Sequence, residues 1–470
     1  MDMLIDGEYV NDMDREDVIN PYTGEVIDTV PISHLNNVDK AIEAANNAKK
    51  FLQEMSAFKI SNKLFNVCDK LKENRDDFAE LLTKEVGKPI NESYVELDRS
   101  VETLKFAAEE AKRIYGESVP LDAGLNGKGF FAFTQKLPLG VVAAITPFNY
   151  PLNLTIHKIA PAIAAKNTVI IKPPTNAPLT VMKFSELVNE EFPDGVINVI
   201  TGYGSEVGDA LVASDKIDKI SFTGSVLTGL LIAQRAGMKK VTLELGGNDP
   251  LVVLEDANVD AAVKGVINGA YLNAGQVCMG VKRIIVQEGI YNKFKTRLVE
   301  ETSKIKIGNP MDKSTQLGTL ISEKAAMQVE ETVNNAVNAG AEILTGGKRN
   351  GAFYEATVID KVTPDMDLVV NETFGPVAPL IKVKTVDEAI QIANATEYGL
   401  QAGVFTENYK NAMRCANEIE AGTVFINKQS TFRTDNMPFG GFKNSGCGKE
   451  GIKYAVEEMT KTKLIGLNLR

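Results

Sequence analysis

The chain has 470 residues, of which 44% are hydrophobic, and its 51 basic and 62 acidic side chains give a net charge of −11. A chain of this length can build more than one core, so we expect two large domains. The acidic balance argues against nucleic acid or an anionic membrane as a partner.

The sequence carries no signal for a membrane or for secretion. No apolar run approaches the roughly 20 residues of a membrane span. Residues 1–6 lack the basic and apolar regions of a secretory signal. The four cysteines, Cys68, Cys278, Cys415 and Cys447, have neither disulfide nor metal-ligand spacing. Reduced thiols in the cytoplasm are the simplest interpretation, and we expect no metal.

The N-terminal part of the chain is predicted to be scaffold. Short strands and a turn at residues 20–24 precede three helices. Asn36 or Asn37 can cap the first helix, the second covers about residues 61–86, and the third about residues 92–115. The second helix carries Cys68 on its apolar face, so we expect this thiol in the core.

Between residues 118 and 142 the pattern changes toward a period of two, which predicts strands of an antiparallel ribbon. Phenylalanines at 130, 131 and 133 would need covering, by the same chain or by a neighbouring subunit. The C-terminal tail, residues 454–469, ends in another apolar segment that we expect to join this ribbon.

Five short apolar runs follow, separated by segments long enough for helices. They cover residues 141–145, 168–171, 196–200, 219–222 and 241–243. Such alternation predicts a parallel sheet with helices on both faces. Each run ends in a polar or glycine position, at Thr146, Lys172, Thr201 and Gly202, Thr223 and Gly224, and Glu244. Because ligands bind at the carboxyl ends of parallel strands, this edge favours a nucleotide site.

The usual dinucleotide fingerprint is absent. The glycines at 202, 204 and 208 follow a strand but have one residue too many between the last two. The turn from Gly224 to Gly229 also follows a strand and precedes a predicted helix, whose amide N–H groups could hold a pyrophosphate.

Residues 245–442 repeat the alternation, with apolar runs at 251–254, 283–286, 378–383 and 423–426. This predicts a second α/β domain. Its polar, turn-rich loop at residues 432–441 is either an ordinary surface loop or the lining of a substrate mouth.

Two residues stand out as candidates for chemistry. Cys278 lies between Gly275 and Gly280, where small neighbours let a ligand approach closely. It is either a nucleophile or a thiol that fills space. Glu244 lies in an apolar strand before two glycines, and a carboxylate there is costly unless it is neutral, paired or used.

Four motifs in this order resemble the aldehyde dehydrogenase superfamily. They are Pro-Phe-Asn-Tyr-Pro at residues 147–151, Glu-Leu-Gly-Gly at 244–247, Gly-Gln-Val-Cys at 275–278 and Glu-Thr-Phe-Gly-Pro at 372–376. The resemblance runs from residue 20 to the C-terminus. It implies an α/β fold with two Rossmann-like parallel-sheet domains and an antiparallel oligomerisation ribbon, and hence a dimer or tetramer. The cofactor domain would comprise residues 1–117 and 140–244, the catalytic domain 245–442, and the bridging element 118–139 and 443–470.

The resemblance also implies a mechanism for oxidising an aldehyde. Cys278 would attack the carbonyl, and the side-chain amide of Asn149 with the backbone N–H of Cys278 would hold the resulting oxyanion. Transfer of hydride to a nicotinamide would then leave a thioester on Cys278. Glu244 would activate the water that hydrolyses this thioester. Lys158 and Glu450 match positions proposed as a proton path to this base.

The cofactor implied is NADP, with NAD also usable. Members that prefer NAD commonly carry glutamate where this chain has Thr175, so the carboxylate that would repel a 2′-phosphate is missing. The alternative is that Thr175 only begins a loop and the enzyme uses NAD. The predicted cofactor-binding residues are Thr146, Pro147, Lys172, Thr175, Gly202, Thr223, Gly224, Ser225, Leu245, Glu372 and Phe374.

Other classes of function remain open from the residues alone. A cysteine hydrolase or acyltransferase without redox cofactor is disfavoured, because the chain has two histidines and neither lies beside a serine or cysteine motif. A non-catalytic nucleotide-binding module is disfavoured by the intact set of Asn149, Glu244 and Cys278.

The substrate expected is a small aldehyde. The runs at 146–154, 157–161 and 435–439 look most like lactaldehyde dehydrogenases of the archaeal type, close relatives of non-phosphorylating glyceraldehyde-3-phosphate dehydrogenases. Members that take the phosphorylated triose commonly carry arginine where this chain has Val277, so an uncharged hydroxyaldehyde is expected. Arg433 and Lys282 could still supply positive charge, which leaves the triose phosphate or a semialdehyde as alternatives.

Overall fold

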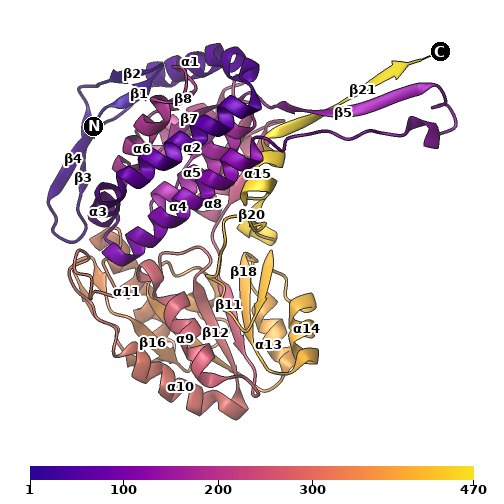
Figure 1. The fold of residues 1–470 in the computed structure, drawn as a ribbon. Coiled ribbons are helices and arrows are strands. Elements are labelled where there is room, and N and C mark those ends of the chain that lie inside the picture. Colours follow the sequence, from indigo (N-terminus) through magenta and orange to yellow (C-terminus); the bar gives the residue numbers. More distant parts are fainter. Residues whose placement is uncertain (470) are drawn as a thin grey trace.

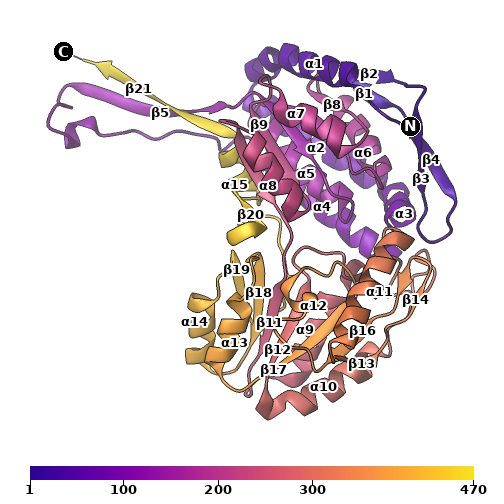
Figure 2. The same ribbon diagram turned by 180° about the vertical axis from the view of Figure 1, so that it is seen from behind.

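The computed structural model describes residues 1–469. Two sheets with helices on their faces lie one above the other, and a long two-stranded ribbon projects from the upper part (Figure 1). The ribbon stands clear of the body in the reverse view as well (Figure 2). Across the described residues, no helix has the length and apolar character needed to cross a membrane.

The first sheet consists of β1 (Met3–Ile5), β2 (Glu8–Val10), β6 (Val141–Ile145), β7 (Thr168–Lys172), β8 (Ile197–Val199), β9 (Lys219–Thr223), β10 (Lys240–Glu244) and β20 (Gly446–Cys447). Its order is β2-β1-β8-β7-β6-β9-β10-β20, parallel from β8 to β10 and antiparallel at the edges. The five predicted apolar runs are confirmed as its parallel strands. They are apolar throughout because both faces of a parallel sheet are covered.

Helices cover the two faces of this sheet. They are α1 (Leu35–Glu54), α2 (Ala57–Glu73), α3 (Arg75–Val86), α4 (Ile90–Glu110), α5 (Pro151–Ala164), α6 (Leu179–Asn189), α7 (Asp209–Ala213), α8 (Val226–Arg235) and α15 (Ile452–Glu458). Along β6, Val142 and Ala144 pack with α2 to α6 and α15, whereas Val141 and Ala143 pack with α1, α7 and α8. Because side chains alternate between the two faces of a strand, those of β6 belong to two separate hydrophobic cores.

Three helix expectations are wrong in detail. Helix α1 begins at Leu35 after His34, so neither Asn36 nor Asn37 caps it. The helix predicted at 61–86 is two helices, because the backbone of Asn74 leaves the helical conformation. The side-chain amide of Asn74 donates to the carbonyl of Lys70 at 2.9 Å. Helix α4 ends at Glu110 rather than near residue 115. Cys68 is fully buried, as predicted.

The second sheet contains β11 (Asp249–Val253), β12 (Val281–Gln287), β13 (Glu342–Thr345), β16 (Thr357–Asp360), β17 (Val377–Val383), β18 (Gln401–Phe405) and β19 (Thr423–Ile426). Its order is β13-β16-β17-β12-β11-β18-β19, and only β13 runs antiparallel to its neighbour. The helices on it are α9 (Val259–Ala270), α10 (Glu288–Thr302), α11 (Glu323–Asn338), α12 (Asp367–Val370), α13 (Val386–Asn394) and α14 (Tyr409–Glu418). The four predicted strands are present, but β13, β16 and β18 were not anticipated.

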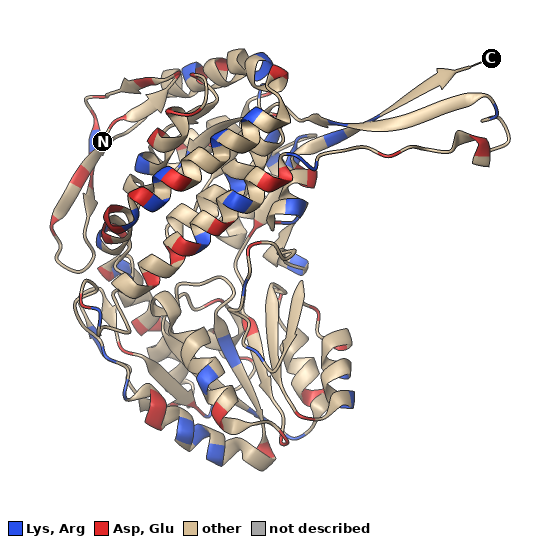
Figure 3. Cartoon of the chain, viewed as in Figure 1, with Lys and Arg blue, Asp and Glu red and all other residues tan. Residues whose placement is uncertain are grey.

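The ribbon pairs β5 (Phe130–Pro138) with β21 (Thr460–Asn468) along their whole length, antiparallel, so the C-terminal tail joins it as predicted. Phe130, Phe131, Leu464 and Leu467 are exposed on it. Charged side chains are sparse on these two strands, whereas basic and acidic residues are interspersed along the helices of the body (Figure 3). The ribbon therefore presents an apolar surface that the chain itself leaves uncovered.

Short elements complete the chain. They are the hairpins β3 (Arg15–Ile19) with β4 (Val26–Pro31) and β14 (Arg349–Asn350) with β15 (Phe353–Tyr354), the 3₁₀ turns Leu121–Ala123, Leu272–Gly275 and Lys443–Ser445, and the π-turn Gly204–Gly208. After β19 the chain returns to the first sheet, where β20 pairs with β10 and α15 packs near α4 and α5. This return brings the loop at 432–441 and Glu450 beside the end of β10.

Candidate active site

The carboxyl ends of β6, β7, β9 and β10 open onto one cavity of about 500 Å³. Twelve predicted site residues line it: Thr146, Pro147, Asn149, Lys172, Thr175, Thr223, Gly224, Ser225, Leu245, Cys278, Glu372 and Phe374. Gly202 instead lines a small neighbouring cleft with Glu16 and Pro31, and Glu244 lies behind the cavity wall. Strand alternation and the family motifs together thus pointed to residues that line one cavity.

Several lining residues escaped prediction. They are Ile145, Phe148, Pro174, Gly204, Gly208, Asp209, Val212, Phe222, Thr228, Ile232 and Gly246. Phe148 belongs to a motif that was recognised, and Gly204 and Gly208 belong to the irregular glycine-rich segment after β8. Those signals were available, whereas nothing in the sequence marks the apolar members of α7 and α8 as cavity residues.

The cavity fits an elongated dinucleotide. At the start of α8, Ser225 accepts from the backbone N–H of Thr228 at 3.3 Å, and both residues line the cavity beside the open first turn of the helix. Such a turn supplies N–H donors for a pyrophosphate. The hydroxyl of Thr146 is buried and has no hydrogen-bond partner among the described residues, so it is available to a ligand.

Lys172 and Thr175 define one end of the cavity. Lys172 Nζ donates to the carbonyl of Pro173 at 3.0 Å and to Thr175 Oγ1 at 3.2 Å. Burial lowers the pKa of Lys172 to about 8. No carboxylate among the described residues is in hydrogen-bonding contact with this buried ammonium, which favours an anionic group at this end.

Glu372 and Phe374 stand near the opposite end with Cys278. Burial raises the pKa of Glu372 to about 7, against the opposing charge of Lys282. The rings of Phe374 and Phe148 lie edge to face, with their centroids 5.9 Å apart. These side chains form a partly apolar enclosure near the thiol, which suits a flat ring with one polar edge.

The loop before Cys278 is held in an unusual backbone conformation. Asn273, Ala274 and Gly275 have φ of 48°, 52° and 73°. A side chain at Gly275 would lie 2.0 Å from the carbonyl oxygen of Gly375, so only glycine fits. The backbone N–H of Asn273 donates to Glu92 on α4 at 2.9 Å. Strain of this kind persists only where surrounding contacts enforce it, and it fixes the direction of Cys278.

Asn149 lies against the same loop. Its side-chain Nδ2 donates to the backbone carbonyl of Gln276 at 2.9 Å. Its backbone carbonyl accepts from Lys88 Nζ at 2.7 Å. Lys88 is fully buried and paired with Glu96 at 2.5 Å. Asn149 and Cys278 thus sit on one cavity wall, which is the arrangement an oxyanion site requires.

The Cys278 thiol is protonated in the resting protein. Burial, with a smaller contribution from the charge of Glu372, raises its pKa to about 12, although Arg433 acts in the opposite direction. A thiolate therefore forms only when a base or an added positive charge acts on this site.

Glu244 ends β10 with 2% of its surface exposed, and neither carboxylate oxygen has a hydrogen-bond partner among the described residues. Burial raises its pKa well above the ordinary value, and the negative charge of Glu450 adds to this. A carboxyl group in this state holds its proton to a higher pH than an ordinary glutamate does.

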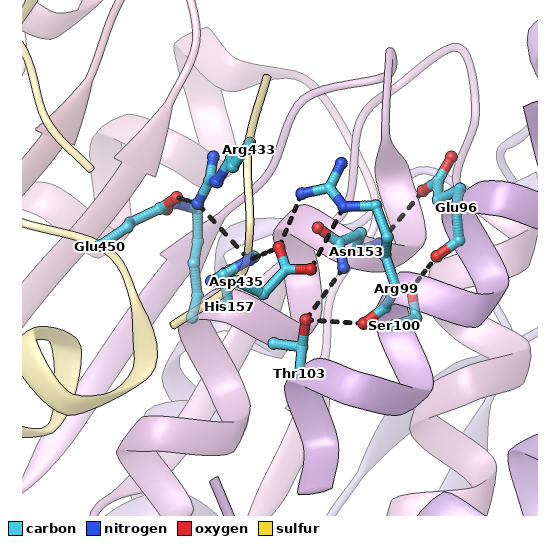
Figure 4. A network of polar contacts seen from close by, with 10 residues as sticks. Glu96, Arg99, Ser100, Thr103, Asn153, His157, Arg433, Asp435 and Glu450 are labelled. Atoms are coloured by element: carbon cyan, nitrogen blue, oxygen red, sulfur yellow. Dashed lines mark hydrogen bonds and ion pairs between the residues drawn. The ribbon is translucent and has the colours of Figure 1, made fainter. Parts of the chain in front are cut away.

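The two residues of the predicted proton path, Lys158 and Glu450, lie in contact with each other. Lys158 Nζ donates to Glu450 Oε1 at 2.9 Å and to Thr223 Oγ1 at 2.6 Å. Arg433, which sequence analysis treated only as a source of charge, donates to Glu450 Oε2 at 3.0 Å. Figure 4 shows Arg433 between Glu450 and His157, and Asp435 between His157 and Arg99.

Comparisons with known proteins agree with this geometry. The model of the aldehyde dehydrogenase family matches residues 9–465. A lactaldehyde dehydrogenase of Methanococcus aeolicus is 42% identical over the whole of both chains. A 3-sulfolactaldehyde dehydrogenase of Priestia aryabhattai is 43% identical, covering 99% of this chain and 98% of its own.

A solved structure gives the same result. Glyceraldehyde-3-phosphate dehydrogenase GapN from Methanocaldococcus jannaschii, complexed with NADP, is 42% identical and superposes with a TM-score of 0.94, covering 98% of this chain and 99% of its own. The family model matches nearly the full length, and relatives are 42% identical, so the chain is not a hydrolase or a binding module of another family. The chain is an oxidoreductase that belongs to the aldehyde dehydrogenase family.

Proposed function

We propose that the protein oxidises a small 2-hydroxyaldehyde of the lactaldehyde type to its carboxylic acid, with NADP preferred over NAD. The observation that carries this proposal is one cavity with Cys278 and Asn149 at one end and Lys172 and Thr175 at the other. Glu244 lies buried behind the cavity wall with no partner for its carboxylate.

The first half of the reaction takes place at Cys278. The Cys278 thiol first releases its proton to solvent, and the thiolate sulfur then adds to the aldehyde carbon. The carbonyl oxygen becomes an oxyanion that accepts from Asn149 Nδ2 and the backbone N–H of Cys278. A bound nicotinamide supplies the hydride acceptor. Loss of hydride from the thiohemiacetal carbon leaves a thioester on Cys278.

The second half depends on Glu244. Its carboxylate removes a proton from water as the water oxygen adds to the thioester carbon, and the thiolate of Cys278 leaves. The carboxylic acid is released and Glu244 carries the proton. The buried pair of Lys158 and Glu450 supplies the route by which that proton moves away from the site.

The substrate class rests on the relatives and on one residue of the nucleophile loop. Two relatives at 42–43% identity are named for lactaldehyde and 3-sulfolactaldehyde. Val277, buried before Cys278, supplies no charge at the position of the phosphate-linked arginine. The alternative substrate is glyceraldehyde 3-phosphate, because the superposed structure at 42% identity is named for it.

The cofactor preference rests on Thr175. It carries no carboxylate to repel a 2′-phosphate, and Lys172 lies 3.2 Å from its hydroxyl. The superposed relative that carries NADP supports the same preference.

We further propose that the ribbon joins two or more copies of this chain. In this arrangement residues 1–117 and 140–244 bind cofactor, 245–442 carry the thiol, and 118–139 with 443–470 bridge subunits. The exposed apolar residues of β5 and β21 support this, because a second copy would bury them. Light scattering on the purified protein tests it, and a monomer at micromolar concentration would refute it.

A spectrophotometric panel tests the activity itself. Lactaldehyde, glyceraldehyde 3-phosphate, succinic semialdehyde and glycolaldehyde are each supplied with NADP or NAD, and reduced cofactor is followed. The proposal expects the highest kcat/KM with a 2-hydroxyaldehyde and NADP. Absence of reduced cofactor with every aldehyde would refute it.

A further inference from the structure

The first turn of α4 joins the part of the molecule built on the first sheet to the part built on the second (Figure 1). Three hydrogen bonds cross between the two parts at consecutive residues of this turn. The pairs are Ile90 N–H with the carbonyl of Pro310 at 2.8 Å, Asn91 Nδ2 with the carbonyl of Lys313 at 2.8 Å, and Asn273 N–H with Glu92 Oε2 at 2.9 Å. Of these bonds, the one to Glu92 reaches the loop that carries Cys278.

The backbone of this loop needs support from outside. Asn273 and Ala274 are buried and have φ of 48° and 52°, a region that alanine rarely occupies. Such a conformation persists only where surrounding contacts enforce it. A buried N–H is costly without an acceptor, so the bond from Asn273 to Glu92 opposes relaxation of the loop.

Asn273 connects Glu92 to both groups that act on the aldehyde. Its Nδ2 donates to the backbone carbonyl of Asn149 at 3.1 Å, and its carbonyl accepts from the backbone N–H of Gln276 at 3.0 Å. The carbonyl of Gln276 in turn accepts from Asn149 Nδ2 at 2.9 Å. A shift of Asn273 therefore moves the oxyanion amide and the backbone that leads to Cys278 together.

The carboxyl group of Glu92 changes its charge near neutral pH. It is half-buried, and burial raises its pKa to about 7, although the charge of Lys88 and the bond from Asn273 act in the opposite direction. The other titratable groups beside it are Glu96, which is paired with Lys88, and Tyr150, whose pKa burial raises well above its ordinary value. An ionised carboxylate accepts a stronger hydrogen bond than a neutral carboxyl group does.

We propose that Glu92 is a positioning residue, which holds the loop before Cys278 in its strained conformation by accepting from the N–H of Asn273. This rests on the proposed function, because it gives Glu92 a part in the first half of that reaction. Glu92 does not line the cofactor cavity, so it acts through Asn273. The effect on rate is large because a misplacement of about 1 Å at a reacting centre can cost roughly 10²-fold.

Hydrogen–deuterium exchange on the unliganded protein tests the contact. Glu92→Leu removes the acceptor, and we expect the amides of residues 273–278 to exchange at least about tenfold faster. Asn91→Leu is the matched control, since it removes the neighbouring bond to Lys313 and leaves the bond to Asn273 in place. Unchanged exchange in Glu92→Leu would overturn the proposal, and so would equal acceleration in both variants.

Pre-steady-state kinetics tests the consequence for the reaction. The rate constant of the burst of reduced cofactor reports thiolate addition and hydride transfer, and the burst amplitude counts intact active sites. Unfolding lowers the amplitude, whereas a misplaced loop lowers the rate constant. We expect Glu92→Leu to lower the rate constant at least about tenfold, with KM for NADP within about threefold of wild type. A wild-type rate constant in Glu92→Leu, or an equal loss in Asn91→Leu, would contradict the assignment.

Glu92→Gln tests the charge, and it decides the matter if Glu92→Leu does not fold. It keeps the size and one acceptor oxygen but cannot ionise, so it should recover most of the rate that Glu92→Leu loses. In wild type the burst rate constant should rise across about pH 6 to about pH 8 as Glu92 ionises, and Glu92→Gln should lack this component. Identical pH profiles in the two proteins would overturn the proposal.

The exchange experiment requires no substrate, so it separates this inference from the proposed activity. Loop protection that depends on Glu92, in a protein that oxidises no aldehyde, refutes only the proposed function. Aldehyde oxidation in a protein whose loop protection and burst rate constant are unaffected by Glu92→Leu refutes only the role of Glu92.

Discussion

Glu244 and Glu450 are two buried carboxyl groups whose pKa values the fold drives in opposite directions. Burial and the neighbouring charge raise the pKa of Glu244. Burial alone would also raise that of Glu450, but Lys158 and Arg433 lower it to about 2. One group therefore stays ionised while the other exchanges its proton, which is the usual way in which a site separates a fixed charge from a base.

Replacing the nucleophile should abolish oxidation while sparing cofactor binding. Cys278→Ala removes the sulfur that forms the thioester, so kcat should fall by at least about 10²- to 10⁴-fold. Dissociation constants for NADP, measured by calorimetry, should stay within about threefold, because the substitution leaves the adenosine end untouched. Cys447→Ala is the control, since Cys447 is exposed on β20. More than about 1% residual kcat in Cys278→Ala would remove it from the mechanism.

Glu244→Gln should separate the two halves of the reaction. Thioester formation does not need this carboxylate, so the variant should release about one reduced cofactor per active site in a burst and then stall. Stopped-flow absorbance measures both phases. Neither oxygen of Glu244 has a partner to lose among the described residues, so we expect the melting temperature of the variant not to fall below that of wild type. Steady turnover at the wild-type rate would assign the base to another group.

The same carboxyl group should make stability depend on pH. The folded protein keeps a proton on Glu244 that the unfolded chain releases above the ordinary glutamate pKa of 4.5. The folded state binds more protons there, so wild-type stability should fall relative to Glu244→Gln as pH rises above about 4.5. Urea titrations of both proteins at about pH 5 and about pH 8 measure the difference. A difference that does not change with pH would mean that Glu244 titrates normally.

Thr175→Glu should shift the cofactor preference. A carboxylate at this position repels the 2′-phosphate and accepts from ribose hydroxyls, so the kcat/KM ratio should move toward NAD by at least about tenfold, or roughly 1.4 kcal/mol. Thr175→Gln, of similar size without charge, is the control and should move it much less. A wild type that prefers NAD, with an unmoved ratio in the variant, would show that Thr175 does not contact the adenosine ribose.

The buried ion pair of Lys88 and Glu96, whose lysine donates to the backbone carbonyl of Asn149, should affect both stability and kcat. Lys88→Met leaves Glu96 buried without its cation, at a cost of about 3 to 5 kcal/mol, and frees the carbonyl of Asn149. We expect a lower melting temperature and a lower kcat, with KM for NADP nearly unchanged. Lys84→Met, at a half-exposed ion pair on α3, is the matched control and should change little. A stable and fully active Lys88→Met would show that this pair does not position Asn149.

Local sequence was sufficient to predict much of the fold of this molecule. The parallel strands of the first sheet appear as short apolar runs because both of their faces are buried, and the polar residue after each run marks the ligand edge. Position within a recognised motif also singled out Cys278, Asn149 and Glu244. A helix break such as that at Asn74 was missed, because the apolar spacing continues across it and only the backbone conformation of that one residue interrupts the helix.

Tertiary structure alone decided the electrostatics of the site. His157 and Asp435 are 278 residues apart, and Lys158 and Glu450 are 292 apart, so their pairing depends on the return of the chain after β19. The sequence identifies Arg433 as a cation, but only the fold shows that its Nε is buried without a partner. Burial and the distance between charges set the pKa of each group, and neither is a property of neighbouring residues in the chain.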